Sequence, residues 1–279
     1  MDELLASVAR RLTRSQLTAR DAALLVAAGL GRSLGDVELA RLLGKCVDAS
    51  EAQRILSLAE RRARREPLQH LVGSAPFLEL ELAVGPGVFV PRPETEVLVE
   101  RAAEELEGAP AGPVADLGSG SGAIAIALAL RVPERAVYAF EASPYTWPWL
   151  RRNIVALAPG IAPRFGDWRA SLDRIDGDFA ALVSNPPYVP AREIPRDPEV
   201  RLFDPETALF SGSDGLDEIR RIAEVAAVRL RPGGFVAVEH TEDQGAAIRQ
   251  LFETRGLVDA HTIQDLAERD RHTFARRPD

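Results

Sequence analysis

The sequence predicts an α/β protein, in which a doubly wound, mostly parallel sheet follows a small helical bundle and a linking β-hairpin. Three observations predict this fold. Residues 2–65 are almost free of proline and aromatic side chains and are rich in Ala, Leu, Arg and Glu. Short apolar runs broken by glycine and proline occupy residues 71–93. After them, strand-like and helix-like segments alternate to the end of the chain.

The amino-terminal stretch favours several short helices. Glycines within residues 29–31 interrupt it, Ser50 before Glu51 has the pattern of a helix N-cap, and Pro67 ends it. No set of acid and base groups stands out here. We therefore interpret residues 1–70 as a helical domain for packing or partner recognition, with structural support alone as the alternative.

Residues 71–93 are expected to form the linking β-hairpin. Residues 78–82, Leu-Glu-Leu-Glu-Leu, alternate with period two, which is typical of a strand with one buried face. The second strand and its exit are expected at residues 88–94, because Pro91 and Pro93 cannot donate to a ladder of hydrogen bonds.

Residues 94–279 are expected to form the α/β domain. The patterns predict strands at residues 114–117, 136–140, 179–184, 234–239, 257–263 and 272–276. They predict helices at residues 95–106, 123–130, 216–230 and 244–254. Strands that alternate with helices imply parallel neighbours, whereas the last two strands, joined without a helix, indicate a hairpin at the edge of the sheet.

Composition excludes several classes of protein. The chain has 279 residues, of which 46% are hydrophobic, so it can bury a sizeable core. Its net charge of -8 disfavours non-specific binding to nucleic acid. Arg61, Arg62, Arg64 and Arg65 are a local basic cluster, but at helical spacing they are expected to spread around the helix as a solvated face.

The cysteine and histidine content bears on metals and on location. Cys46 is the only cysteine, which excludes an internal disulfide and fits a reducing compartment. The four histidines are scattered without metal-ligand spacing, so no metal is expected. The amino terminus is acidic where a signal peptide would be basic, and no run reaches the ~18 apolar residues of a membrane span. We expect a cytoplasmic protein without a membrane partner.

A glycine-rich loop is the first motif with chemical content. Residues 116–124, Asp-Leu-Gly-Ser-Gly-Ser-Gly-Ala-Ile, leave a strand and enter a helix, so their glycines let the backbone approach a ligand closely. A tight strand-to-helix connection is the alternative. The third glycine of GxGxxG is missing and no Lys-Ser or Lys-Thr follows, which disfavours a pyrophosphate. Glu141 ends the next strand, where a carboxylate can accept from both ribose hydroxyls, so a nucleoside without phosphates fits.

A second motif, Asn-Pro-Pro-Tyr at residues 185–188, follows a later strand. Its two prolines stiffen the turn and leave the Asn185 side-chain oxygen and the Pro186 carbonyl as fixed acceptors. Such a pair can accept both hydrogens of a planar NH2 group and aim the nitrogen lone pair at an electrophile, while the Tyr188 ring packs on the group. A rigid proline turn with a capping asparagine is the alternative.

Together these motifs resemble the class I S-adenosylmethionine-dependent methyltransferases. More narrowly, they resemble the HemK/PrmC family, whose members are N5-methyltransferases acting on the GGQ glutamine of class I peptide-chain release factors. The segment at residues 91–96, Pro-Arg-Pro-Glu-Thr-Glu, favours this family over nucleic-acid methyltransferases, because most of those with the Asn-Pro-Pro-Tyr motif lack that segment. The resemblance rests on residues 73–77, 88–96, 116–125 and 185–188, and extends through 204–210, 214–216 and 233–234.

The resemblance implies a Rossmann-like, seven-stranded sheet. It also implies S-adenosyl-L-methionine as the cofactor, S-adenosyl-L-homocysteine as the product, and release factors as protein partners of a monomeric, cytoplasmic enzyme. Residues 1–70 would recognise the substrate. No direct binding of nucleic acid is expected. An adenine-N6 or guanine-N2 methyltransferase acting on DNA or RNA is the alternative enzyme, and a cofactor-binding module retained for scaffolding is the alternative outside catalysis.

The resemblance also carries roles over by position. The implied cofactor-binding residues are Gly118, Ser119, Gly120, Ser121, Gly122, Glu141 at the ribose, Asp167 and Trp168 at the adenine, and Asn185. The implied substrate-binding residues are Phe89, Asn185, Pro186, Pro187 and Tyr188. Among these, Asn185, Pro186 and Tyr188 would be catalytic. For Trp168, ordinary core packing is the alternative.

The sequence departs from the family pattern in three places. Glu141 stands where the family usually has aspartate, which moves the carboxylate by one methylene. Residues 143–149, Ser-Pro-Tyr-Thr-Trp-Pro-Trp, replace an alanine-rich helix, and Pro148 is expected to delay or kink helix formation there. Residues 239–244 are more polar than is usual in the family, and the sequence offers no functional account of them.

Overall fold

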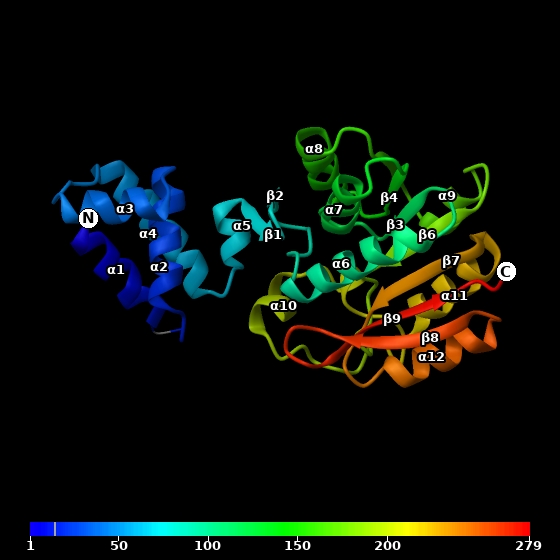
Figure 1. Ribbon diagram of the computed structural model, residues 1–279. Helices are drawn as coiled ribbons and strands as arrows, with labels where there is room; N and C mark the ends of the chain where they lie inside the picture. The colour runs from blue at the N-terminus through cyan, green and yellow to red at the C-terminus, as the bar shows by residue number, and fades with distance from the viewer. Residues whose placement is uncertain (14) are drawn as a thin grey trace. The chain divides into compact units, whose positions relative to one another are not determined.

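The computed structural model describes residues 1–13 and 15–279 (Figure 1). The chain divides into two compact units, each with a hydrophobic core of its own. The first unit comprises Met1–Ser74, Val84–Pro86 and Pro195–Phe203. The second comprises Ala75–Ala83, Gly87–Ile194 and Asp204–Asp279.

The first unit is helical, as the sequence predicts. Capping boxes start α2, α3 and α4, in which the side chain of Thr18, Ser33 or Asp48 accepts from the helix backbone. The expected N-cap at Ser50 is wrong, because the Asp48 carboxylate lies two residues earlier and accepts from the Ser50 N–H at 2.8 Å. The helices are α1 (Asp2–Thr13), α2 (Ala19–Leu30), α3 (Leu34–Leu42), α4 (Ala49–Ala63), α5 (Leu68–Val72) and α10 (Pro198–Phe203).

The arginine cluster at the end of α4 is not the solvated face that we expected. Arg62 is buried at 7% exposure and donates to the Glu199 carboxylate of α10 at 2.8 Å and to the Glu66 carbonyl at 2.9 Å. Arg65 also donates to Glu199, at 3.2 Å, and Arg61 pairs with the Glu66 carboxylate. Ion pairs within the unit therefore neutralise much of this basic cluster.

The β-hairpin lies earlier in the chain than expected. Its strands are β1 (Ser74–Phe77) and β2 (Leu80–Ala83), and they form a separate two-stranded sheet. Leu78 has a φ of 52°, so the alternating Leu-Glu run contains the turn rather than one continuous strand. The predicted second strand at residues 88–94 is wrong, since this segment is a loop that ends at α6 (Pro93–Gly108).

The second unit is built on the predicted seven-stranded, mostly parallel sheet. Its strand order is β5-β4-β3-β6-β7-β9-β8, with β9 antiparallel to both of its neighbours. The interior strand β3 continues into the glycine-rich loop, and the chain reverses its direction of winding there. The strands are β3 (Val114–Leu117), β4 (Val137–Glu141), β5 (Ala162–Phe165), β6 (Phe179–Ser184), β7 (Leu230–Glu239), β8 (Val258–Gln264) and β9 (Asp270–Arg276).

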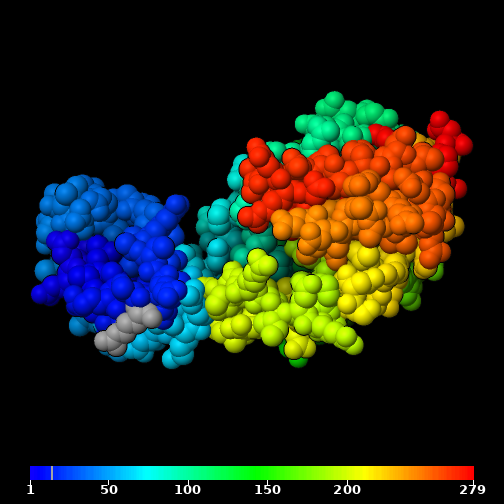
Figure 2. Space-filling model, turned by 90° about the horizontal axis from the view of Figure 1, so that it is seen from below, coloured from blue at the N-terminus to red at the C-terminus, as the bar shows by residue number. Residues whose placement is uncertain are grey.

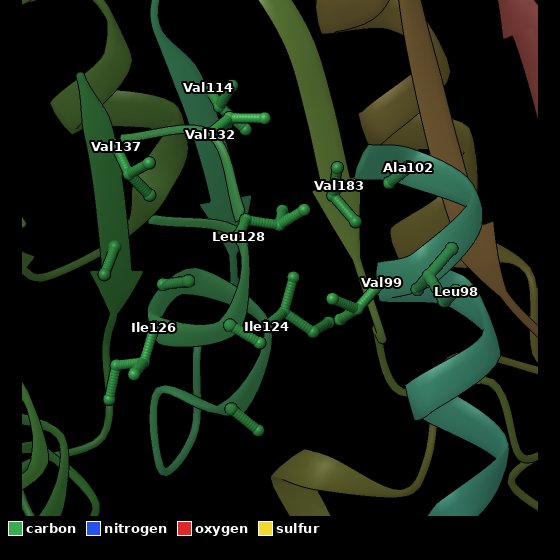
Figure 3. Packing of buried hydrophobic residues seen from close by; sticks show 14 of the residues in the cluster. Leu98, Val99, Ala102, Val114, Ile124, Ile126, Leu128, Val132, Val137 and Val183 are labelled. Atoms are coloured by element: carbon green, nitrogen blue, oxygen red, sulfur yellow. The ribbon is translucent and has the colours of Figure 1, made fainter. Parts of the chain in front are cut away.

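Helices cover both faces of this sheet (Figure 1). Alternate residues of β3 face opposite cores: Val114 belongs to the cluster that includes α6, α7 and α8, and Ala115 to the cluster that includes α9, α11 and α12. In Figure 3, Val99 of α6 and Ile124 of α7 point toward one another beside β6. Figure 2 shows yellow α11 adjoining orange α12 at the surface. The other helices are α7 (Ala123–Arg131), α8 (Trp147–Leu157), α9 (Trp168–Leu172), η1 (Glu206–Ala208), α11 (Asp217–Arg229) and α12 (Gly245–Thr254).

Helix α8 shows how the unusual aromatic segment folds. It begins at Trp147, so Pro148 occupies the first helical turn, where a missing N–H breaks no bond within the helix. Of the two expected effects of Pro148, the helix start after the turn at residues 144–146 fits the delay, whereas a kink inside the helix does not arise at this position. The side chain of Thr146 donates to the Gly87 carbonyl at 2.7 Å and ties this helix start to the loop before α6.

Candidate active site

The sequence-predicted residues meet at one edge of the sheet. β5, β4, β3 and β6 are neighbouring parallel strands, so their carboxyl ends lie side by side. β5 leads to Asp167 and Trp168, β4 ends at Glu141, β3 leads to the glycine loop and β6 leads to Asn185. Ligands of doubly wound sheets bind at this edge, where the direction of winding changes.

The glycine loop has a backbone that other residues would adopt only with strain. Gly118, Gly120 and Gly122 have φ angles of 77°, 58° and 90°, all in the left-handed region. A Cβ at Gly118 or Gly120 would meet no described atom within 4 Å, whereas one at Gly122 would lie 2.8 Å from a methyl of Leu150. The first two glycines therefore border open space that a ligand can enter, and the third permits close packing of α8.

Glu141 holds this loop through its carboxylate. One oxygen accepts from the Gly120 N–H at 2.9 Å and the other from the Ser143 N–H at 2.7 Å. Burial raises the pKa of Glu141, while these backbone donors act in the opposite direction. Each oxygen of a carboxylate can accept a second hydrogen bond, so both retain a site for a hydroxyl group.

Asp116 is a buried carboxyl beneath the loop. One of its oxygens accepts from the Ala125 N–H at 3.1 Å, and its Oδ1 has no hydrogen-bond partner in residues 1–13 and 15–279. Burial raises the pKa of Asp116 to about 7, although the hydrogen bond from the Ala125 N–H favours the charged form. The Ser119 hydroxyl donates to the Asp116 carbonyl at 3.0 Å, and Ser121 is buried beside it and accepts from Asn153 through its carbonyl.

These features fit a nucleoside-type cofactor. Open space in front of two glycines, a carboxylate with a free site on each oxygen and a buried, unpartnered carboxyl oxygen all lie at one edge. Positive side chains for a pyrophosphate are not part of this loop, which reads Gly-Ser-Gly-Ser-Gly. In the described part of the chain, no group of three or more His, Cys, Asp or Glu side chains could hold a metal ion.

Asp167 and Trp168 follow β5 and start α9. The Asp167 carboxylate caps the helix by accepting from the Arg169 N–H at 2.9 Å, and it also pairs with the Arg169 guanidinium at 3.0 Å. Trp168 is buried at 7% exposure in the core under the sheet, and its indole N–H donates to Glu218 at 2.9 Å. Core packing therefore accounts for much of the Trp168 ring, while a contact of this pair with an adenine stays a prediction.

The Asn185 turn lies beside the glycine loop. The Ser184 hydroxyl donates to the Leu117 carbonyl at 2.5 Å and joins the ends of β6 and β3. The Asn185 Nδ2 donates to the Thr95 hydroxyl at 3.0 Å. Among the described residues, none donates to the Asn185 Oδ1 or to the Pro186 carbonyl, so this turn offers two uncommitted acceptors.

Tyr188 is held by polar contacts at both ends. Its hydroxyl donates to the Glu239 Oε1 at 3.3 Å, and its carbonyl accepts from the Gln244 Nε2 at 3.0 Å. Burial and the nearby Glu239 carboxylate raise the pKa of Tyr188 far above its ordinary value, so the hydroxyl stays protonated. Gly215 is required here, because a Cβ would lie 2.1 Å from the Tyr188 carbonyl oxygen.

Phe89 lies in the loop before α6 and is half-buried. The Arg92 guanidinium lies 4.9 Å from the centre of its ring, and Arg92 pairs with Asp204 at 3.0 Å. These contacts fix one side of Phe89, whereas its contact with a substrate stays a prediction. Pro187 is half-buried between Pro186 and Tyr188 in the turn.

Thr95 and Glu239 belong to this site, and the sequence reasoning assigned them no role. The Thr95 hydroxyl donates to the Glu239 Oε2 at 2.7 Å, and both side chains are buried, at 4% and 1% exposure. The available signal was positional: Glu239 ends β7, the neighbour of β6, and Thr95 lies in the first turn of the helix that packs on β6.

Two family models match separate parts of the chain. A model of the methyltransferase small domain matches residues 79–204, and a model of the PrmC N-terminal domain matches residues 3–73. A methyltransferase from Pyrococcus furiosus has a similar structure, with a TM-score of 0.52, 19% identity and coverage of 79% of this chain and 100% of that chain. At this identity the similarity concerns the fold.

Sequence relatives are much closer. The release factor glutamine methyltransferase of Bifidobacterium longum is 42% identical over 268 residues, which cover 91% of each chain. The release factor glutamine methyltransferase of Streptomyces coelicolor is 43% identical over 234 residues, which cover 82% of this chain and 83% of the relative. The chain therefore belongs to the family of release factor glutamine methyltransferases.

Proposed function

We propose that this chain transfers a methyl group from S-adenosyl-L-methionine to the side-chain amide nitrogen of the GGQ glutamine in class I peptide-chain release factors. One observation carries the proposal: Asn185 and Pro186 present two uncommitted acceptors beside a glycine loop that borders open space. Two acceptors side by side match the two hydrogens of a primary amide. The family relationship supports the glutamine of a release factor as the owner of that amide.

The cofactor is assigned to the edge formed by the carboxyl ends of β3, β4 and β5. The loop from Gly118 to Gly122 would contact its methionine and ribose portions, the Glu141 carboxylate would accept from the ribose hydroxyls, and Asp167 with Trp168 would border the adenine. S-Adenosyl-L-methionine supplies an electrophilic methyl group on its sulfonium and leaves as S-adenosyl-L-homocysteine. No metal takes part in this proposal.

The protein contributes mainly orientation. An amide nitrogen is a poor nucleophile because its lone pair is delocalised. By accepting both amide hydrogens, the Asn185 Oδ1 and the Pro186 carbonyl hold the nitrogen so that its lone pair faces the methyl group. Phe89, Pro187 and the Tyr188 ring wall the space for the glutamine side chain. No strong base lies in the turn, so the rate enhancement comes mostly from orientation, and the nitrogen loses one proton to water during or after transfer.

The helical amino-terminal region is proposed to dock the release factor. We divide the chain into a recognition domain at residues 1–70, a linking segment at 71–93 and a catalytic domain at 94–279. Leu39 and Leu42 of α3 are 55% and 72% exposed. Apolar side chains that water covers in the free protein are suited to a protein surface.

The docking proposal has a direct test. Replacing Leu39 and Leu42 by aspartate is expected to raise the KM for an intact release factor about 30-fold, since each of the two lost apolar contacts costs on the order of 1 kcal/mol. The KM for a short GGQ peptide is expected to stay unchanged. The matched control is Leu266→Asp, in a turn at 86% exposure. An equal rise in both KM values would contradict docking at α3.

We propose the cellular compartment from the nature of the substrate. Release factors work on ribosomes, so we place the enzyme in the cytoplasm, acting as a monomer without direct binding of nucleic acid. Of the described helices, none is long and apolar enough to cross a membrane.

Labelled methyl transfer tests the proposed function. The purified full chain is incubated with labelled S-adenosyl-L-methionine and a release factor that carries either GGQ or GGA, and in parallel with total RNA and with DNA. We expect label on the GGQ protein alone. Label on nucleic acid would favour an adenine-N6 or guanine-N2 methyltransferase, and cofactor binding without any transfer would favour a scaffolding role.

A further inference from the structure

A buried chain of hydrogen bonds ends at the Asn185 side chain. The Asn185 Nδ2 donates to the Thr95 hydroxyl at 3.0 Å, and that hydroxyl donates to the Glu239 Oε2 at 2.7 Å. The three residues come from the end of β6, the start of α6 and the end of β7. Thr95 lies 90 residues from Asn185 and 144 from Glu239 along the sequence, so the fold alone brings them together.

The direction of each bond follows from the chemistry of the donors. An ionised carboxylate can only accept, and a threonine hydroxyl has one proton to give. Because the Thr95 proton goes to Glu239, its oxygen must accept from its other partner. The NH2 end of Asn185 satisfies this requirement, whereas the oxygen end would leave two acceptors facing each other without a proton.

Glu239 is itself fixed on several sides. Its Oε1 accepts from the Tyr188 hydroxyl at 3.3 Å, and its Oε2 lies 3.8 Å from the Nε2 of buried His272. Glu239 also pairs with His272 across the β7–β9 ladder. Both oxygens of the Glu239 carboxylate accept from hydroxyl groups. Glu239 therefore presents no donor to Thr95.

We infer that Thr95 and Glu239 are positioning residues that select one orientation of the Asn185 amide. In that orientation the Nδ2 faces Thr95 and the Oδ1 is left for the NH2 group of the methyl acceptor. The inference rests on the proposed function and extends it to two side chains that do not touch the substrate. An inverted Asn185 would present its own NH2 to the glutamine NH2, and two donors cannot pair.

Three variants of the full chain test the inference. Thr95→Val keeps the shape and removes the hydroxyl, so the amide loses its preferred orientation. Glu239→Gln keeps the shape but allows a donor to face Thr95, which permits the inverted chain of bonds. For each we expect kcat for the GGQ release factor to fall about tenfold or more, with KM and the cofactor Kd within about twofold of wild type. Thr95→Ser keeps the hydroxyl and is expected to restore kcat to within about threefold.

A matched control tests whether the loss of any hydrogen-bonded threonine hydroxyl lowers kcat, or only the loss of the one that contacts Asn185. Thr262 lies on the edge strand β8 and bonds to Arg249 and Thr273 through its hydroxyl. Thr262→Val therefore removes a threonine hydroxyl away from the Asn185 turn and is expected to leave kcat within about twofold of wild type.

The outcomes are distinguishable. Wild-type kcat in Thr95→Val and Glu239→Gln, in an enzyme that methylates the GGQ glutamine, would overturn the positioning role alone. A loss that appears equally in kcat, cofactor Kd and unfolding free energy, and that Thr95→Ser does not reverse, would overturn it as well, because it marks a structural defect. Absence of transfer to the GGQ glutamine by the wild-type chain would instead overturn the proposed function and the inference with it.

Discussion

The glycine loop and the Asn185 turn lie at the ends of neighbouring strands, but they are held in different ways. The loop is shaped by three glycines at positive φ and by Glu141 at the end of the neighbouring strand, whose carboxylate accepts from the backbone N–H groups of Gly120 and Ser143. The turn is oriented by side chains that lie far away in the sequence, Thr95 and Glu239. The proposed cofactor half, built mainly from backbone, thus adjoins a proposed substrate half that is oriented by long-range hydrogen bonds.

The largest expected effect separates the two halves. We predict that Asn185→Ala lowers kcat about 10²- to 10³-fold, because misplacing a reacting group costs this much, and that the cofactor Kd changes at most about fivefold. Steady-state kinetics with a GGQ release factor and calorimetric titration of the cofactor provide the two numbers. Wild-type turnover, or an equal loss of affinity and turnover, would show that the halves are not separate.

A variant of Glu141 is expected to show the reverse pattern, with a change in the cofactor Kd and little change in kcat. In Glu141→Gln, an NH2 group replaces one carboxylate oxygen and faces a backbone N–H, so we predict a rise of about 30-fold in the cofactor Kd. We predict kcat at saturating cofactor within about threefold of wild type. Glu141→Asp is the control, with a change in Kd below about fivefold, because both acceptors remain. A loss of kcat in Glu141→Gln without a change in Kd would contradict this division.

Two glycines of the loop sharpen the comparison further. Gly120→Ala is expected to cost about 1–2 kcal/mol of unfolding free energy from backbone strain, and to weaken cofactor binding by filling open space. Gly122→Ala is expected to cost about 1 kcal/mol more, since its Cβ would contact Leu150 at 2.8 Å and Ile126 at 3.1 Å. Urea denaturation and cofactor titration test both variants. Equal stability losses would refute the different packing of the two positions.

Asp116 is expected to act on the pH dependence of stability rather than on activity. Its pKa is raised to about 7 in the folded chain because of burial, and it is near 4 when unfolded. Between these values the folded state binds the extra proton, so Asp116 lowers the unfolding free energy as pH rises from about 4 to about 7, by at most about 4 kcal/mol. Asp116→Asn is expected to flatten this slope in denaturation at a series of pH values. An unchanged slope would contradict the assignment.

The same comparison explains what could be predicted from the sequence. The sheet, the glycine loop and the Asn185 turn are encoded in contiguous residues, so period, glycine spacing and paired prolines were sufficient to predict them. The roles of Thr95 and Glu239 could not be predicted, because a hydrogen bond across more than a hundred residues leaves no local pattern in the sequence. The prediction of a hairpin strand at residues 88–94 is wrong because the hairpin turns at Leu78, inside the Leu-Glu run. The positive φ of Leu78 has no signal in the sequence pattern.

The paired acceptors are tested most directly by a crystal structure of the full chain with S-adenosyl-L-homocysteine and a GGQ peptide. The distances to measure run from the glutamine side-chain nitrogen to the Asn185 Oδ1 and to the Pro186 carbonyl oxygen. We predict that both are hydrogen bonds of about 2.7–3.2 Å, with the Asn185 Nδ2 still on Thr95. A glutamine amide bound elsewhere, or an Asn185 amide turned with its Nδ2 toward the peptide, would contradict the proposed reaction geometry.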